Sequence, residues 1–128
     1  MKAVIIESAP SVGTMLTFPV GNELLIDHLL SALKQQGIRE VAIVSGRTCG
    51  MLVLWRTESV YRGTAGGLQT LEDFLDTPTF LCIHANVYLR DMDLAAVLHA
   101  HEAHRAGITL VAQSMVGNDH DLASVEVD

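Results

Sequence analysis

Residues Phe80–Leu94 read FLCIHANVYLRDMDL, and this stretch decides the fold class. It opens with the apolar run Phe80–Ile83, which predicts a central strand buried on both faces, as in a parallel sheet covered by helices. The next residues are His84, Ala85 and Asn86, and ligands of open α/β sheets bind outside the carboxyl ends of the strands. These three residues are therefore candidate site residues, although any strand must also leave the core through polar residues.

Strands and helices alternate along the rest of the chain. Short apolar or alternating runs predict strands at Ala3–Ile6, Val41–Ser45, Ile108–Ala112 and Ala123–Val127, and weaker ones at Met51–Trp55 and Glu58–Tyr61. Apolar residues at helical spacing predict helices over Asn22–Gln36, which Gly37 would cap, Thr64–Leu75 and Leu94–Ala106. The proline-containing segment Glu7–Val20 reads as a loop. This order predicts βαβ units and an α/β fold with a mixed, mostly parallel sheet.

Length and composition limit the class of protein. A chain of 128 residues predicts a single domain over residues 1–128, and 49% hydrophobic residues suggest surface committed to a partner. The net charge of −7 argues against nucleic acid and anionic membrane as partners. Cys49 and Cys82, the latter in a predicted buried strand, are expected to be reduced thiols. Because no stretch approaches a membrane span or a signal-peptide core, we expect a cytoplasmic protein.

Four segments, in this order, resemble the sugar-1-phosphate nucleotidyltransferases, the pyrophosphorylases that make nucleotide-sugars such as GDP-mannose (mannose-1-phosphate guanylyltransferase) and dTDP-glucose (glucose-1-phosphate thymidylyltransferase). The segments are MKAVII at the start, FPVGNELLIDHLLSALKQQGIREVAIVSG from residue 18, RGTAGG from residue 62, and FLCIHANVYLRDMDL. The resemblance implies a Rossmann-like three-layer α/β/α fold of the nucleotide-diphospho-sugar transferase type, whose first half binds the nucleotide. The final SVEVD is similar to the family's sixth strand, so we expect a chain truncated relative to the family.

The segment after the first strand departs from the family pattern. In the family, a loop of roughly LAGGxGTRL holds phosphate oxygens with backbone N–H groups, and a lysine follows. Here Gly13 and Thr14 match the GT pair and are candidate nucleotide-binding residues, but Met15 stands in place of the arginine. The glycine pair and the lysine are missing, and Glu7 adds a negative charge where the triphosphate would lie.

The residues after Phe80–Leu81 depart as well. The family reads LNGD where this chain has Ile83–Asn86, and its aspartate holds Mg²⁺. Asn86 offers only a neutral carbonyl oxygen, whereas hard divalent cations prefer carboxylates. Nucleotidyl transfer needs metal and cationic groups to neutralise developing charge. We therefore predict impaired catalysis, with no catalytic residue, no resident metal ion, and a role for Mg²⁺ only if activity is retained.

Nucleotide recognition can outlast the loss of catalysis. Gly63, Thr64, Ala65 and Gly66 match the family's GTAG loop, which lets a base lie against backbone; the alternative is that the glycines only allow the turn. Thr64 would also make an ordinary N-cap. Two other polar groups have simpler interpretations: Asp91 and Asp93 as acids at a helix start, and the histidines at 99, 101 and 104 as ordinary helix residues rather than metal ligands.

Three functions remain open. The first is a catalytically impaired nucleotidyltransferase-like domain that binds a nucleotide or nucleotide-sugar and acts as a regulatory or assembly subunit. The second is an active nucleotidyltransferase completed by further chain or a partner, and the third is a ligand-free structural interaction domain. Because truncation would uncover apolar surface, we also expect a homodimer, with contacts through Ala123–Val127 and Met51–Trp55, where Trp55 is the natural anchor.

Overall fold

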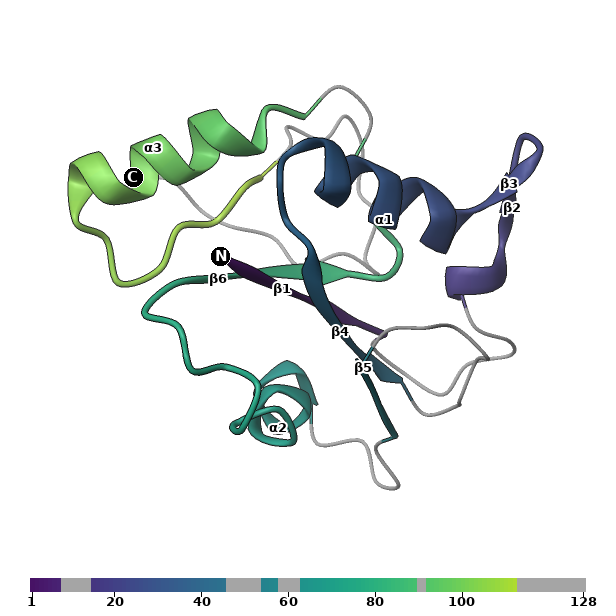
Figure 1. Cartoon of the computed structure of the whole chain (residues 1–128), viewed down its shortest axis with the longest axis horizontal. Coiled ribbons are helices and arrows are strands. Elements are labelled where there is room, and N and C mark those ends of the chain that lie inside the picture. Colours follow the sequence, from purple (N-terminus) through teal and green to yellow (C-terminus); the bar gives the residue numbers. More distant parts are fainter. Residues whose placement is uncertain (8–14, 46–53, 58–62, 90–91, 113–128) are drawn as a thin grey trace, which may run out of the picture. The chain divides into compact units, whose positions relative to one another are not determined.

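Strand β1 (Lys2–Ile6) is an inner strand of a four-stranded sheet in the computed structural model (Figure 1). The structure describes residues 1–7, 15–45, 54–57, 63–89 and 92–112. The strand order is β5-β4-β1-β6, with β4 spanning Glu40–Ser45, β5 Leu54–Thr57 and β6 Phe80–His84. Every pairing in this sheet is parallel. The chain is thus an α/β protein with a mostly parallel sheet, as the alternation of strands and helices predicts.

The chain divides into two units, Met1–Met92 and Asp93–Asp128. The first contains the whole sheet together with helices α1 (Leu25–Gln35) and α2 (Gly63–Gln69), and the second contains helix α3 (Leu94–His104). The prediction of a single domain stays a prediction. No helix in the described ranges is both long and apolar enough to cross a membrane.

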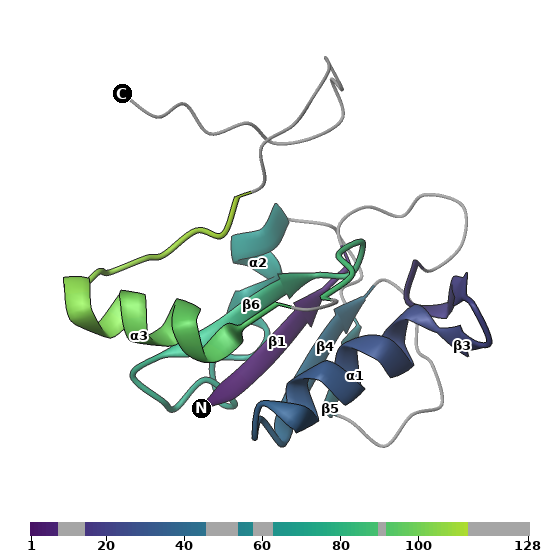
Figure 2. The ribbon, with the colours of Figure 1, turned by 90° about the horizontal axis from the view of Figure 1, so that it is seen from above.

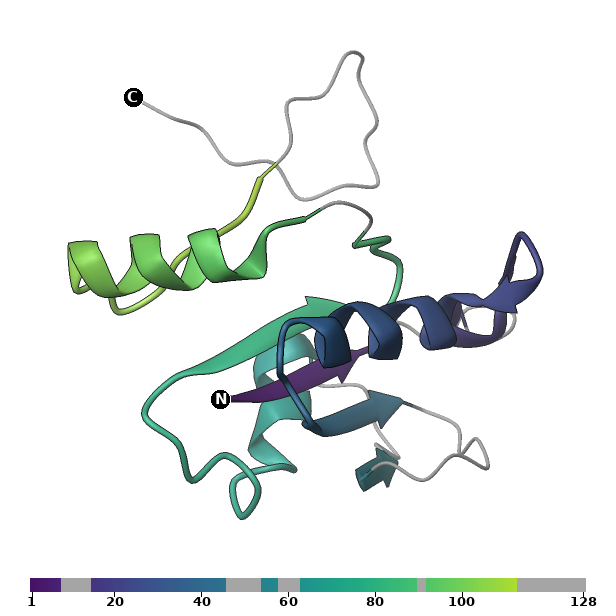
Figure 3. The same cartoon turned by 45° about the horizontal axis from the view of Figure 1, so that its top comes forward.

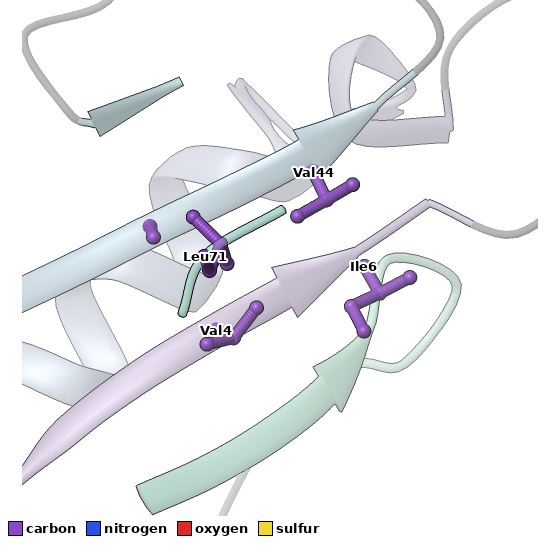
Figure 4. Packing of buried hydrophobic residues seen from close by; sticks show 5 residues of the cluster. Val4, Ile6, Val44 and Leu71 are labelled. Carbon is purple, nitrogen blue, oxygen red and sulfur yellow. The ribbon is translucent and has the colours of Figure 1, made fainter. Parts of the chain in front are cut away.

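The core of the first unit lies on both faces of β1. On one face, Val4 and Ile6 pack with Ala42 and Val44 of β4 and with Leu71, which follows α2 (Figure 4). Leu68, Phe74 and Leu75 pack around this cluster, so the four residues that the sequence puts on one helical face do meet the core, although only Leu68 lies in the helix. Because side chains alternate along a strand, Ala3 and Ile5 point to the opposite face, and both are completely buried. Helix α1 lies on that side of the strands and α2 on the other (Figures 2 and 3).

The sequence predicts an apolar stripe on helix α1 made of Leu25, Leu29, Leu30 and Leu33. Leu25, Leu29 and Leu33 are buried as expected, and Leu30 is half-buried. It begins three residues after the predicted start at Asn22, because Glu23–Leu24 form strand β3, which pairs with β2 (Pro19–Val20) around the left-handed Gly21. The short 3-10 helix η1 (Met15–Thr17) and β2 lie within the segment that the sequence predicted as a loop.

The end of α1 is a complete Schellman motif, which confirms Gly37 as the cap. Gly37 has a φ of +78°, its N–H donates to the Lys34 carbonyl at 3.0 Å, and the N–H of Ile38 donates to the Leu33 carbonyl at 2.9 Å. Ile38 and Leu33 are both buried, so the capping turn also contributes to the core. Only glycine adopts this backbone conformation without strain.

Helix α2 is shorter than predicted, ending at Gln69 rather than Leu75. The hydroxyl of Thr70 donates to the Gly67 carbonyl at 2.7 Å, a local bond of the kind that competes with continued helix. The N–H groups of Phe74 and Leu75 both donate to the Leu71 carbonyl, so the chain continues as turns. The helix begins at Gly63, which places Thr64 inside the first turn, and the prediction of Thr64 as the N-cap is wrong.

Strand β6 differs from the prediction of a central strand buried on both faces. Among the described residues it pairs with β1 alone, and Phe80, Cys82 and His84 are exposed while Ile83 is buried. The register places those three exposed residues beside Lys2, Val4 and Ile6, on the α2 side of the sheet. The cluster around Leu71 covers that side of β1 and β4 but not of β6, and Cys82 is therefore a free, exposed cysteine.

In the second unit, α3 begins at the predicted residue, and Asp93 is confirmed as a helix-start acid because its carboxylate accepts the N–H of Ala96 at 3.0 Å. The sequence predicts that Leu94, Val97, Leu98 and His101 face inward on this helix. The burial pattern agrees, because Leu94 is buried and the other three are half-buried, whereas the remaining residues of the helix are exposed. The predicted strand Ile108–Ala112 is wrong: these residues form no strand, and Ile108 is 81% exposed. Three other predictions, namely Asp91, the strand Glu58–Tyr61 and the strand Ala123–Val127, lie outside the described residues.

Lys2 joins three parts of the first unit at the amino end of the sheet. Its ammonium nitrogen lies 2.6 Å from an Asp76 carboxylate oxygen and 3.5 Å from one of Glu40, donates to the Phe74 carbonyl at 2.9 Å, and lies 4.7 Å from the centre of the Phe74 ring. The hydrogen bond and charge of Lys2 hold the pKa of Asp76 below its usual 3.8. The same partners, Asp76 first, raise the pKa of Lys2 above 10.5, against the opposing effect of its partial desolvation.

We expect Gly37→Ala to lower the free energy of unfolding by about 1 kcal/mol, because alanine is strained in the left-handed conformation. Added bulk is not the cause, since a Cβ at residue 37 meets no atom within 4 Å. Urea denaturation followed by circular dichroism measures the effect. Gly107→Ala is the control, because Gly107 also has open space but no positive φ. Equal effects of the two changes would contradict the capping role.

We expect the stability of the Asp76→Asn variant to depend less on pH, in the acid range, than the stability of the wild type. A carboxyl whose pKa is lowered by folding stabilises the folded state above its unfolded pKa, and this contribution disappears as the pH falls through the lowered value. The melting temperature of the variant should therefore change less than that of the wild type between pH 6 and a pH below the usual 3.8. Glu72→Gln, an exposed acid on the preceding turn, should retain the wild-type profile.

Candidate functional site

The carboxyl ends of β1, β4 and β6 meet at one edge of the sheet, which we call the carboxyl edge. Ile6 is in register with Val44 on one side and with His84 on the other. The N–H of Glu7 donates to the Val44 carbonyl at 2.9 Å, and the N–H of Ala85 donates to the Ile6 carbonyl at 2.8 Å. Backbone hydrogen bonds therefore continue one residue past the ends of β1 and β6, and they fix the positions of Glu7 and Ala85.

The strand order singles out the end of β1 within this carboxyl edge. From β1 the chain passes through α1 to β4 and on to β5, and it then returns through α2 to β6 on the other side of β1. Successive strands are thus added in opposite directions from β1, with the helices on opposite faces (Figure 1). In open α/β sheets, such a reversal separates the two connections at the carboxyl ends and leaves space where ligands bind.

Glu7 and Ser45 form a polar pair at the carboxyl edge. The Ser45 hydroxyl donates to carboxylate oxygen Oε2 of Glu7, across the ends of β1 and β4. Ser45 is only 1% exposed and is the one buried polar residue of the described core, whereas Glu7 is half-buried. Val44 points toward Leu71, so Ser45, the next residue, points to the α1 side. Sequence analysis missed Ser45, although a serine ending an otherwise apolar strand was a usable signal.

The predicted site residues at the end of β6 lie at the carboxyl edge, as the sequence indicated. His84 ends the strand and is exposed, Ala85 is buried, and Asn86 is exposed in the turn that follows. The N–H of Val87 donates to the His84 carbonyl at 3.1 Å and closes this turn. His84, Ala85 and Asn86 are therefore brought to the same edge as Glu7 and Ser45.

The structure describes only some of the other predicted site residues. Gly63 begins α2 with a φ of +78°, a backbone conformation that favours glycine whether or not a ligand binds there. No atom lies within 4 Å of the position that a Cβ would take. Thr64 and Gly66 are half-buried, and Ala65 is exposed. Gly13 and Thr14 lie outside the described residues. Hence the convergence of all nine predicted residues on one site stays a prediction.

The start of α1 carries its own acids. The carboxylate of Asp27 accepts the N–H of Leu24 at 3.3 Å, and Glu23 lies 3.7 Å from Nδ1 of His28. Nε2 of His28 lies 3.0 Å from the Val20 carbonyl oxygen, and its ring meets that of Tyr88 edge-on at 5.2 Å. His28 thereby ties the β2–β3 hairpin and the segment after β6 to the same turn of α1.

Groups capable of metal binding or thiol chemistry are few in the described ranges. No three histidine, cysteine, aspartate or glutamate side chains there are grouped to hold a metal ion. His101 of α3 has its Nδ1 2.9 Å from the Thr109 hydroxyl, an ordinary polar contact. Although Cys82 is exposed, neighbouring protein atoms partly desolvate its thiol and raise its pKa, which disfavours the reactive thiolate.

Comparison of the chain with protein-family models and with curated proteins finds no match. The site is therefore interpreted from its own geometry, and the resemblance to nucleotidyltransferases stays a hypothesis.

We expect Ser45→Ala to destabilise the protein by about 1–2 kcal/mol, because Glu7 would lose a hydrogen-bond donor in a half-buried position. Urea denaturation gives the value. The control is Ser31→Ala on the exposed face of α1, which should be neutral or slightly stabilising because alanine favours helix. A neutral Ser45→Ala variant would show that the pair contributes nothing to stability.

Proposed function

We propose that the chain is a nucleotidyltransferase-like domain that binds a nucleotide-type ligand at the carboxyl edge and does not catalyse nucleotidyl transfer. The observation that carries this proposal is the reversal of strand order at β1, which puts Glu7, Ser45 and His84–Asn86 at the position where open α/β sheets bind ligands. In this proposal the fold is a Rossmann-like three-layer α/β/α sandwich, with the sheet between α1 and α2, and the protein acts as a cytoplasmic regulatory or assembly subunit.

The proposed loss of catalysis rests on the charges at this edge. Asn86 occupies the turn where the family pattern has a metal-binding aspartate, and Glu7, at the end of β1, is an acid. Nucleotidyl transfer needs positive charge near the phosphates, and Met15, in η1, supplies none. The arginine and the lysine of the family's loop are both absent from this chain, and for that reason we prefer binding without transfer.

A second candidate function is protein–protein interaction. Several large apolar side chains of the first unit are exposed, among them Phe18 at 58%, Tyr88 at 45% and Phe80 at 36%. Exposed aromatic residues are common anchors of interfaces. The proposed homodimer belongs here, although the segments predicted to form it, Met51–Trp55 and Ala123–Val127, lie largely outside the described residues.

We expect the purified protein to catalyse no pyrophosphorolysis of nucleotide-sugars when it is supplied with pyrophosphate and Mg²⁺. The reaction is measured as nucleoside triphosphate formed above a buffer blank. Asn86→Asp should not restore activity, because one added carboxylate does not replace the missing cations. Turnover by the wild type that disappears in Asn86→Ala would contradict the proposal.

Binding is tested separately by thermal denaturation with a panel of nucleosides and nucleotides. A ligand at a hundred times its dissociation constant should stabilise the fold by ~2.7 kcal/mol and raise the melting temperature. Asn86→Ala should weaken the response, whereas Asn22→Ala, an exposed asparagine of the β2–β3 turn, should leave it unchanged. No stabilisation by any ligand would favour the interaction domain.

A further inference from the structure

The segment that leaves the carboxyl edge after β6 carries an exposed tyrosine between two buried residues. Ala85 is buried and its N–H donates to the Ile6 carbonyl at 2.8 Å, and Leu89 is buried as well. Val87 and Tyr88, which lie between them, are exposed. Because the chain is anchored on both sides of Tyr88, the position of this tyrosine beyond the end of β6 is fixed.

Helix α1 holds the ring of Tyr88 from one side. His28, in the first turn of α1, meets the tyrosine in a T-shaped contact, with ring centroids 5.2 Å apart and an interplanar angle of 87°. Nε2 of His28 lies 3.0 Å from the Val20 carbonyl oxygen, so the histidine is itself fixed to the β2–β3 hairpin. A T-shaped contact covers at most one face of an aromatic ring. His28 therefore leaves a face of the Tyr88 ring for another group, in agreement with the exposure of this residue.

A ring fixed in this way suits stacking against a planar group. Nucleobases present a flat π surface, and stacking on an aromatic side chain stabilises their binding. The entropic cost of ordering the side chain is small at Tyr88, because His28 and the buried neighbours already hold it in place.

The exposed aromatic residue Phe80 has no such position. It begins β6, and four residue steps of about 3.3 Å put it about 13 Å from His84, at the amino end of the strand. A ligand at the carboxyl edge is therefore within reach of Tyr88 and out of reach of Phe80.

We infer that Tyr88 is a base-stacking residue, so that a ligand at the carboxyl edge lays a planar nucleobase against the ring that His28 holds in place. This inference rests on the proposed function, because it assumes that a nucleotide-type ligand binds at this edge. It names the base as the part of the ligand that Tyr88 recognises, and His28 as a positioning residue.

Isothermal titration calorimetry with nucleoside monophosphates, and with ribose 5-phosphate as the matching probe without a base, tests the inference. Tyr88→Phe keeps the ring and should bind each monophosphate within about threefold of the wild type. Tyr88→Leu keeps apolar bulk without a π face and should bind about tenfold more weakly. Phe80→Leu, the same kind of change at an exposed aromatic residue of the amino end, should leave the affinity unchanged. Circular dichroism verifies that each variant is folded.

The positioning role of His28 has a separate readout. His28→Ala should weaken monophosphate binding about threefold in the wild type and should have no further effect in the Tyr88→Leu variant, because the histidine acts through the tyrosine ring. Equal losses in the two backgrounds would show that His28 does not act through Tyr88.

Two results would overturn the inference and leave the proposed function standing. One is monophosphate binding that Tyr88→Leu leaves within threefold of the wild type, which would make Tyr88 an anchor for a protein partner instead. The other is a loss of ribose 5-phosphate affinity in Tyr88→Leu as large as that of the monophosphate, which would place the sugar rather than the base on the ring. Failure of the wild type to bind any nucleoside or nucleotide would overturn both.

Discussion

Strand β1 is hydrogen-bonded on both sides, to β4 and to β6, and is covered on both of its faces. A strand in this position must be apolar at every interior residue, and Ala3–Ile6 are all at most 2% exposed. Polar groups are then possible only where the strand ends. Lys2 and Glu7 occupy those two ends of β1, Lys2 paired with Asp76 and Glu7 hydrogen-bonded to Ser45.

Sequence reasoning found the elements whose signal is local. β1, β4, α1 and its glycine cap depend on short apolar runs, a helical stripe and one residue in a left-handed turn. It failed where the outcome depends on what covers a segment. The run Phe80–Ile83 is as apolar as β1, yet half of it is exposed, because an apolar run does not reveal how many neighbours a strand has. The same limit explains Ile108–Ala112, whose β-branched residues form no strand.

The candidate site was predictable in part. Because a parallel sheet gathers the carboxyl ends of its strands, the position of His84–Asn86 followed from the fold class alone. The partnership of Glu7 with Ser45 did not, since 38 residues separate them and only the register of β1 with β4 brings them together. The family resemblance drew attention to what is missing from the signature loop, whereas the geometry adds a positive feature: an acid that is already hydrogen-bonded and fixed in place.

The placement of β1 between an early and a late neighbour has a consequence for folding during synthesis. β1, α1 and β4 are complete once Ser45 has emerged from the ribosome, but the second partner of β1 begins only at Phe80. At about 5–20 residues per second, the intervening stretch of roughly 35 residues takes about 2–7 s to translate. For that interval the nascent chain presents the bare edge of its most apolar strand, which is the condition under which chaperones are recruited and neighbouring chains misassociate.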